Sequence, residues 1–204
     1  ETFARQKQLG VIPADCQLTA RNKEVPTWDE MPAAFKPVLA REMEVYAGFL
    51  EFTDYNVGRI VDMLKKLNIL DDTLIYYIVG DNGASAEGSL NGCFNEMSYF
   101  NGLQTLETPE YLTARLDKLG GPESYNHYAV GWTLAMDTPY QWTKQVASHW
   151  GGTRNGTVVH WPKGIKAKGE IRSQFTHVID VAPTILEAAH LPQPQSVNGI
   201  QQDP

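Results

Sequence analysis

Two oxygen-bearing side chains, Asp81 and Asn82, follow a short apolar run and are the first candidates for chemistry in this chain. The run is Thr73–Gly80, and Gly83 comes directly after the pair. Carboxylate and amide oxygens are hard ligands that suit Ca²⁺ or Mg²⁺. Asp-Asn-Gly is also a common turn sequence, so on these three residues alone a plain turn is the simpler interpretation and a metal site is the alternative.

The apolar run itself is predicted to be a buried strand that delivers a site. A run rich in Ile, Val and Tyr is typical of a strand covered on both faces, although periodicity does not separate it from a buried helix segment. Gly80 and Gly83 favour the strand. Ligands of open α/β sheets bind just beyond the carboxyl ends of strands, where Asp81 and Asn82 would project.

A long amphipathic helix is predicted before this strand, from about Lys36 to Asn68. Apolar residues recur there at steps of three and four, with charged residues largely between them. The apolar stripe consists of Leu39, Met43, Tyr46, Leu50, Val57, Ile60, Val61 and Leu64. A short connection then leads into the strand, as expected of an α/β unit. Residues 1–37 carry four prolines and predict an extended, loop-rich approach to the helix.

The chain beyond Asn82 adds further candidates. Residues 83–121 are mostly irregular, with a helical patch at 108–119, and such an insertion after a strand usually builds a rim or lid. His127 lies in an aromatic stretch, where a satisfied core histidine is the simpler interpretation and direct chemistry the alternative. A Gly-Gly pair at 151–152 would let the backbone approach a ligand or another strand closely.

The last third of the chain predicts a second strand and a helix. The strand is 157–162, and the helix begins with Asp180 as its cap, with Pro183 tolerated in its first turn. His160 and His177 are expected to be structural, since their surroundings are apolar and strand-like.

Composition sets limits on the class of protein. The chain has 204 residues, 42% hydrophobic and 20% charged, enough for one domain with a core. A net charge of -7 and a pI near 5.2 argue against a nucleic-acid partner. No apolar run approaches the roughly 20 residues of a membrane span. Cys16 and Cys93 give neither a disulfide framework nor metal-type spacing, so a cytoplasmic and a periplasmic or secreted location fit equally well.

Five short segments carry a more specific pattern through their order and spacing. They are Val79–Gly83, Tyr140–Lys144, His149–Arg154, Val159–Gly164 and Asp180–Thr184. Each piece is common, but together they resemble the arylsulfatases of the sulfatase family. The resemblance runs over essentially the whole chain and is closest to the bacterial branch.

The resemblance implies an α/β fold like that of alkaline phosphatase, with a large mixed sheet flanked by helices, incomplete in this chain. It implies hydrolysis of small-molecule sulfate esters by a formylglycine hydrate beside one divalent cation, usually Ca²⁺, with Mg²⁺ as the alternative. Asp81 and Asn82 match the cation-binding pair, and Lys144 matches the lysine that contacts the sulfate. His149 is the second predicted catalytic and substrate-binding residue, either facing the substrate or supporting it. Fixed cations in a dry pocket would stabilise the charge that develops on the ester oxygens.

The sequence also departs from the family pattern. The formylglycine arises in the family from a C-x-P-x-R or S-x-P-x-R motif, and neither occurs here: Cys16 is followed by Gln-Leu-Thr-Ala-Arg and Cys93 by Phe-Asn-Glu. The paired N-terminal aspartates and the leaving-group histidine are missing as well. We therefore expect residues 1–204 to be part of one sulfatase catalytic domain, with the N-terminal half and the C-terminal subdomain absent, and to be inactive alone.

Two other functions remain open at this stage. One is a phosphate or phosphonate ester hydrolase of the same superfamily, and the other is a non-catalytic interaction module that kept the scaffold. The natural ester, the oligomeric state and the role of Arg154 are not predicted. The Asn155–Thr157 sequon is taken as incidental.

Overall fold

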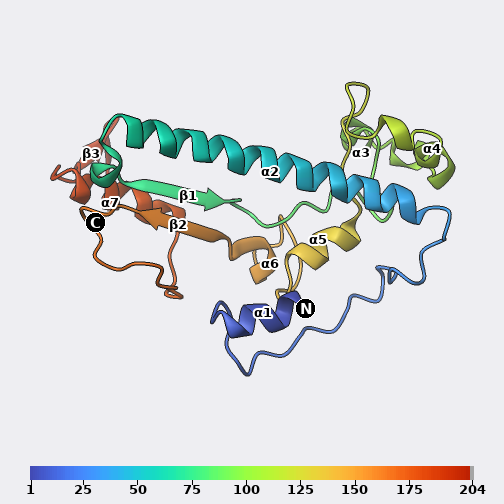
Figure 1. Cartoon of the computed structure of the whole chain (residues 1–204), viewed down its shortest axis with the longest axis horizontal. Coiled ribbons are helices and arrows are strands. Elements are labelled where there is room, and N and C mark those ends of the chain that lie inside the picture. Colours follow the sequence, from blue (N-terminus) through green and yellow to red (C-terminus); the bar gives the residue numbers. More distant parts are fainter. Residues whose placement is uncertain (203–204) are drawn as a thin grey trace.

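Helix α2, Lys36–Lys66, is the longest element and runs along most of the molecule in the computed structural model, which describes residues 1–202 (Figure 1). Its first turn contains Pro37, which needs no backbone partner there. Leu67 is the C-cap of the helix, and Asn68 follows with a φ of 57°, a left-handed conformation that asparagine tolerates. The prediction of a long helix over this range is confirmed.

The other elements are short and are separated by long irregular segments. The helices are α1 (Thr2–Gln8), α3 (Glu96–Phe100), α4 (Pro109–Thr113), α5 (Val130–Met136), α6 (Trp150–Thr153) and α7 (Val181–Ala188). The strands are β1 (Ile75–Val79), β2 (Gly156–His160), β3 (Ser196–Val197) and β4 (Ile200–Gln201). Single 3₁₀ turns occupy Leu70–Asp72, Gln104–Leu106, Leu116–Lys118 and Val178–Asp180. The loop-rich character predicted for the N-terminal segment and for 83–121 is confirmed.

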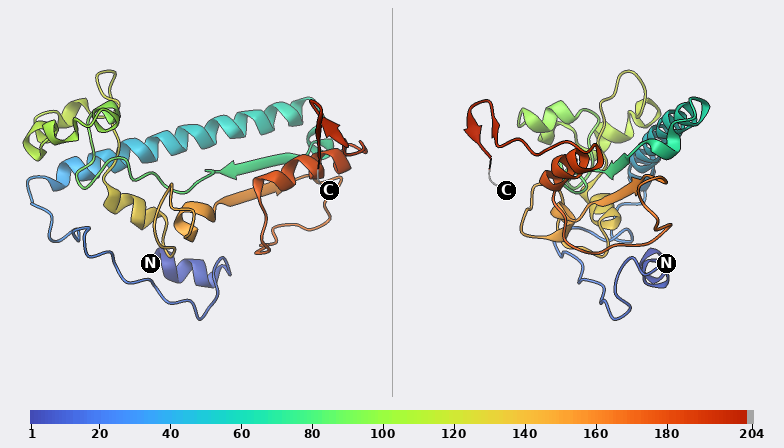
Figure 2. Two further views of the ribbon diagram at one scale, coloured as in Figure 1. Left: turned by 180° about the vertical axis from the view of Figure 1, so that it is seen from behind. Right: turned by 90° about the vertical axis from the view of Figure 1, so that its left-hand side faces the viewer.

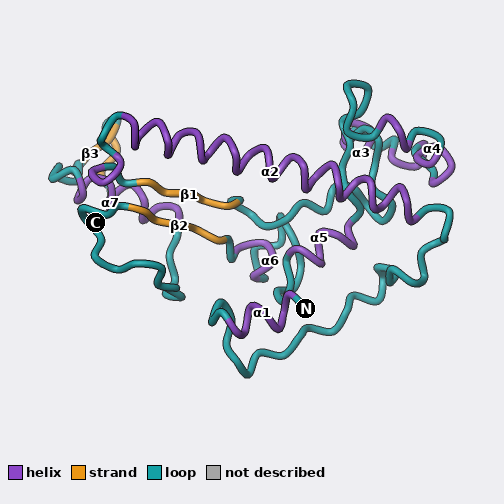
Figure 3. Tube along the Cα trace, in the orientation of Figure 1, coloured by secondary structure: helices purple, strands orange, loops and turns teal. Residues whose placement is uncertain are grey.

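Strands β1 and β2 lie side by side as a two-stranded ribbon (Figure 3). They pair antiparallel, with Ile75 opposite His160 and Val79 opposite Gly156. Strands β3 and β4 form a second two-stranded sheet near the C-terminal end of the described residues. The mixture of helices and strands agrees with the predicted α/β class. The large mixed sheet is not formed within residues 1–202.

The prediction that β1 is covered on both faces is wrong for this structure. Ile78 and Val79 are 42% and 49% exposed. The end-on view in Figure 2 shows α2 on one side of the ribbon and α7 on the other. Because the ribbon has only two strands and α7 is only eight residues long, much of both faces stays open.

A small core lies at the N-terminal end of α2. It consists of Phe35, Val38, Leu39, Phe94, Leu112, Leu119 and Ala129, with Leu116 and Trp132 packed against it. The indole N–H of Trp132 donates to the Leu39 carbonyl at 2.9 Å, which joins α5 to α2. The helical patch predicted at 108–119 is only partly formed, as α4 and the separate 3₁₀ turn Leu116–Lys118, and Leu112 and Leu119 pack into this core.

The C-terminal helix α7 (Val181–Ala188) is present with Asp180 at its N-cap position, as predicted, but the Asp180 side chain does not cap it. Asp180 makes no side-chain hydrogen bond to the start of α7. Its carboxylate instead accepts from the His177 backbone N–H at 2.7 Å, in a capping box around the preceding 3₁₀ turn. His177 has a structural role there, as predicted, but it is exposed and caps a 3₁₀ turn, so the apolar, strand-like surroundings expected for it are wrong. No helix within residues 1–202 is both long enough and apolar enough to cross a membrane.

Candidate functional site

The loop after β1 carries Asp81 and Asn82 between two glycines that the backbone requires. Gly80 and Gly83 have φ angles of 76° and 83°, a region that side chains other than glycine rarely adopt. The Gly83 N–H donates to Oδ1 of Asn155 at 3.0 Å, so a residue beside β2 fixes the loop. Asp81 and Asn82 are both exposed at the end of the strand, which is the placement that the sequence predicted.

A pocket of about 440 Å³ opens beside this loop. Asp81, Asn82 and Lys144 all line it, so three of the four predicted site residues share one cavity. Its remaining walls come from α2, from the rest of the 80–85 loop and from the 126–128 segment. Those lining residues are Glu42, Val45, Tyr46, Phe49, Gly80, Gly83, Ala84, Ser85, Asn126, His127 and Tyr128.

The Gly151–Gly152 pair brings Lys144 to the Asp81 loop. A Cβ on Gly151 would lie 1.9 Å from the carbonyl oxygen of Trp142, and a Cβ on Gly83 would lie 1.9 Å from that of Gly151. Three stretches of backbone can therefore pack together only without side chains at these positions. The Lys144 N–H also donates to the Ala84 carbonyl at 2.9 Å. The close backbone approach predicted for the glycine pair is confirmed, although the partners are loops and not a strand.

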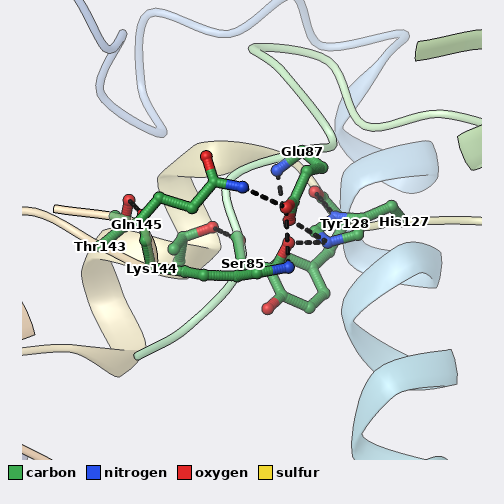
Figure 4. Close-up of polar contacts among 8 residues, drawn as sticks. Ser85, Glu87, His127, Tyr128, Thr143, Lys144 and Gln145 are labelled. Carbon is green, nitrogen blue, oxygen red and sulfur yellow. Dashed lines mark hydrogen bonds and ion pairs between the residues drawn. The ribbon is translucent and has the colours of Figure 1, made fainter. Parts of the chain in front are cut away.

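The Lys144 ammonium is paired with a buried carboxylate. Its Nζ donates to Oε1 of Glu87 at 2.7 Å, and Nε2 of Gln145 donates to the same oxygen at 3.3 Å (Figure 4). Oε2 of Glu87 is buried without a hydrogen-bond partner among residues 1–202 and lies 3.9 Å from Nε2 of His127.

Both ring nitrogens of His127 have partners, as expected of a satisfied histidine. Nδ1 lies 2.8 Å from the Tyr128 carbonyl, and since a carbonyl only accepts, Nδ1 carries the proton. Nε2 lies 2.7 Å from Oγ of Ser85 (Figure 4). His127 nevertheless lines the pocket, so the structural interpretation and a chemical role are compatible.

Two acids near the pocket have pKa values shifted upwards by burial. Desolvation raises the pKa of Glu42 to about 9, although its Oε2 accepts from the Ala129 N–H at 3.2 Å. Burial also raises the pKa of Asp137 to about 6, against the lowering effect of the Ala84 N–H, which donates to Oδ1 at 3.4 Å. Glu42 is therefore neutral at pH 7 and adds no negative charge to the pocket wall.

The fourth predicted site residue, His149, does not line the pocket with the other three. Its ring packs against Trp142 with centroids 5.7 Å apart, and Nδ1 lies 2.9 Å from Oγ of Ser148. The guanidinium of Arg154, which the sequence left unassigned, stacks over the rings of Tyr140 and Trp150 at 5.4 and 4.7 Å.

Two groups of residues could hold a metal ion. Asp81 and Asn82 offer exposed hard oxygens at the strand end, the donor type that Ca²⁺ and Mg²⁺ take. Glu87, Glu96 and His127 place ligand atoms within 4.8 Å of one another. The second group already holds the Lys144 ammonium at 2.7 Å from Glu87, and that positive charge opposes a cation there. The Asp81 group is therefore the better candidate of the two on electrostatic grounds.

Sequence reasoning missed three residues at or beside this pocket: Glu42, which lines it, Glu87, which pairs with Lys144, and Asn155, which holds the 80–85 loop. Glu42 carried a detectable signal, because it lies three residues after Leu39 and four before Tyr46 on the apolar side of the helix. Glu87 lies in an irregular segment and had no local signal. Asn155 was noticed only as part of a sequon.

Comparison with known proteins adds an independent finding. The model of the family described as Sulfatase matches residues 11–191. The chain is 34% identical over 190 residues to an uncharacterized sulfatase of Schizosaccharomyces pombe, covering 93% of this chain and 32% of that protein. It is 28% identical over 194 residues to an arylsulfatase of Klebsiella aerogenes, covering 93% of this chain and 38% of that protein. The chain thus spans about a third of the length of these relatives.

Proposed function

This chain belongs to the sulfatase family, and from that premise we propose that its 80–85 loop and Lys144 form part of the active site of an arylsulfatase-type sulfuric ester hydrolase. The observation that carries the proposal is the pocket shared by Asp81, Asn82 and Lys144. A site for a sulfate ester needs positive charge around the sulfur centre. Lys144 offers one positive charge directly, and Asp81 and Asn82 offer two oxygen ligands for a metal cation.

We assign Asp81 and Asn82 as ligands of one divalent cation, Ca²⁺ or Mg²⁺. The donor set fits, because one carboxylate and one amide oxygen are exposed at the same pocket wall. Ca²⁺ takes six to eight oxygens, so these two residues alone should bind it weakly, at roughly millimolar concentration. A bound cation would supply Lewis-acid stabilisation of the ester oxygens.

Lys144 is the proposed contact to the sulfate. Its ammonium has three donors, and Glu87 occupies one of them. The backbone contact to Ala84 places the side chain at the pocket wall, where two donors remain for an anion. We propose that His149 supports the site indirectly, through the packing of its ring against Trp142.

The nucleophile is not supplied by these residues. The 204 residues contain neither C-x-P-x-R nor S-x-P-x-R, the motifs from which the family resemblance implies a formylglycine. We therefore expect no sulfatase turnover from these 204 residues by themselves. Binding, and not activity, is the informative measurement on this chain.

The test is a titration of the ¹⁵N-labelled chain with CaCl₂, followed by the amide shifts of residues 80–83. We expect saturable shifts at this loop, and Asp81→Asn should weaken binding by about tenfold or more, since a carboxylate becomes a neutral amide. Asp54→Asn, at an exposed position of α2, is the matched control and should leave the titration unchanged. Equal affinity of wild type and Asp81→Asn would rule out the assignment.

A further inference from the structure

The ion pair between Lys144 and Glu87 differs from the other ion pairs formed by Lys and Arg within residues 1–202. Those pairs join side chains that are 44% or more exposed. The Glu87 side chain is only 7% exposed, and that of Lys144 is 29% exposed. A buried carboxylate is costly unless it is paired, so Glu87 depends on Lys144 as its counter-ion.

The backbone around Lys144 is held as firmly as its side chain. Trp142 and Gln145 adopt φ angles of 63° and 74°, which residues other than glycine adopt only when the surrounding structure imposes them. Thr143 is buried, and the Gly151 N–H donates to the carbonyl of Gln141 at 3.0 Å. The side chain of Gln145 turns back to Oε1 of Glu87, the oxygen that also accepts from Lys144.

We propose that Glu87 is a positioning residue that fixes the Lys144 ammonium at the pocket wall and competes with the anionic substrate for its charge. The proposal rests on the proposed function of Lys144 as the sulfate contact. A carboxylate 2.7 Å from the ammonium offsets most of its attraction for a second anion. Asp81 adds a further negative charge to the same pocket. A sulfate group at the two remaining donors of Lys144 therefore meets an ammonium whose charge Glu87 largely offsets, and a cation at Asp81 and Asn82 would supply further positive charge.

The first part of the test measures whether Glu87 holds Lys144. The folded chain is acetylated briefly with an N-hydroxysuccinimide ester, and each lysine is quantified by mass spectrometry. Glu87→Gln keeps the shape but removes the charge, and we expect acetylation of Lys144 to rise about tenfold relative to Lys118, because a hydrogen bond to a charged group is lost. Glu44→Gln is the matched control: it breaks the exposed pair with Arg41 and should leave the ratio of Lys144 to Lys118 labelling unchanged.

If Glu87→Gln does not fold, Glu87→Asp provides the second variant. Its shorter side chain retracts the carboxylate by about one carbon–carbon bond and should raise labelling of Lys144 in part. A ratio of Lys144 to Lys118 labelling that stays at the wild-type value in a folded variant would overturn the proposal.

The second part measures competition, by adding sodium sulfate at constant ionic strength before labelling. We expect sulfate to protect Lys144, with the half-protecting concentration about tenfold lower in Glu87→Gln than in wild type, since the ammonium is no longer neutralised. Equal protection in both proteins would overturn the competing role of Glu87. Protection in neither protein, with the labelling ratio still responding to Glu87→Gln, would instead reject the sulfate role of Lys144 and leave the anchoring by Glu87 supported.

Discussion

Glu42 shows how one residue can shape a pocket without carrying charge. Its side chain is fully buried, and its Oε1 has no hydrogen-bond partner among residues 1–202. Gly92 permits this placement, because a Cβ there would lie 2.0 Å from Oε1 of Glu42. Burial raises the pKa of Glu42 from 4.5 to about 9, so the acid stays protonated through neutral pH.

This shift predicts a pH dependence of stability. The folded chain binds the Glu42 proton more tightly than the unfolded chain, so between pH 4.5 and 9 the free energy of unfolding falls as the pH rises, by up to about 1.4 kcal/mol per pH unit. Glu42→Gln keeps an acceptor for the Ala129 N–H and cannot ionise. We expect this variant to lose most of that slope and to be more stable than wild type above pH 7, as measured by urea unfolding from pH 5 to 9.

The matched control is Glu44→Gln, two residues further along the same helix. Glu44 is exposed and pairs at the surface with Arg41 at 3.4 Å. Its replacement should leave the pH slope of wild type unchanged. A Glu42→Gln variant with the wild-type slope would show that the buried acid is not the source of the dependence.

The structural role of Asn155 could not be predicted from its sequence pattern. Asn155-Gly-Thr157 reads as a glycosylation sequon, yet the amide oxygen accepts from the Gly83 N–H at 3.0 Å. That hydrogen bond joins positions 72 residues apart, and only the tertiary structure shows it. The interpretation of the sequon as incidental agrees with this structural use of the side chain.

At the scale of elements, apolar periodicity was sufficient to predict the helices and strands whose pattern is contained in one short stretch of sequence. The range of α2 and the packing of Leu112 and Leu119 follow from apolar spacing alone. Strand β1, which ends at Val79, was also predictable, because its apolar residues stop at Gly80. The Lys144–Glu87 pair was not, since it depends on loops that no periodic pattern describes.

The glycine contacts around Gly83 lead to a prediction about the elements that meet there. Alanine at Gly83 would have a strained φ of 83° and a Cβ 1.9 Å from the Gly151 carbonyl oxygen. We expect Gly83→Ala to lower the free energy of unfolding by at least about 2 kcal/mol. Gly48→Ala, inside α2 with no atom within 4 Å of the new Cβ, should raise it by about 0.5–1 kcal/mol.

Urea unfolding of the two variants against wild type measures this difference, and the amide spectrum of residues 80–83 reports the loop itself. The opposite signs are the informative result, because both changes add the same methyl group. If Gly83→Ala were as stable as wild type, the three backbones would not pack as closely as the structure shows.

At the scale of the whole molecule, the predicted apolar stripe of α2 is present, but other elements cover only part of it. Val38 and Leu39 are buried, whereas Leu50 and Ile60, further along the helix, are exposed. Strands β1 and β2 pair only with each other within residues 1–202, so each leaves an open edge. The sequence could predict an apolar helix face and apolar strands, but not how much of each these 204 residues would cover.

This open apolar surface predicts that the 204-residue chain associates in solution. Ile60 and Val158 are 56% and 57% exposed, among other large apolar side chains on α2 and β2. Large exposed apolar patches and free strand edges mark association sites.

Light scattering coupled to size exclusion should show a mass above 22.8 kDa that rises with concentration. Ile60→Lys should raise the concentration for half association about tenfold, because one apolar side chain of the stripe is lost from the contact. Gln104→Lys adds the same charge at an exposed site off this helix and should change nothing. A monomer at all concentrations would contradict this prediction and show that the exposed apolar side chains of α2 do not drive association.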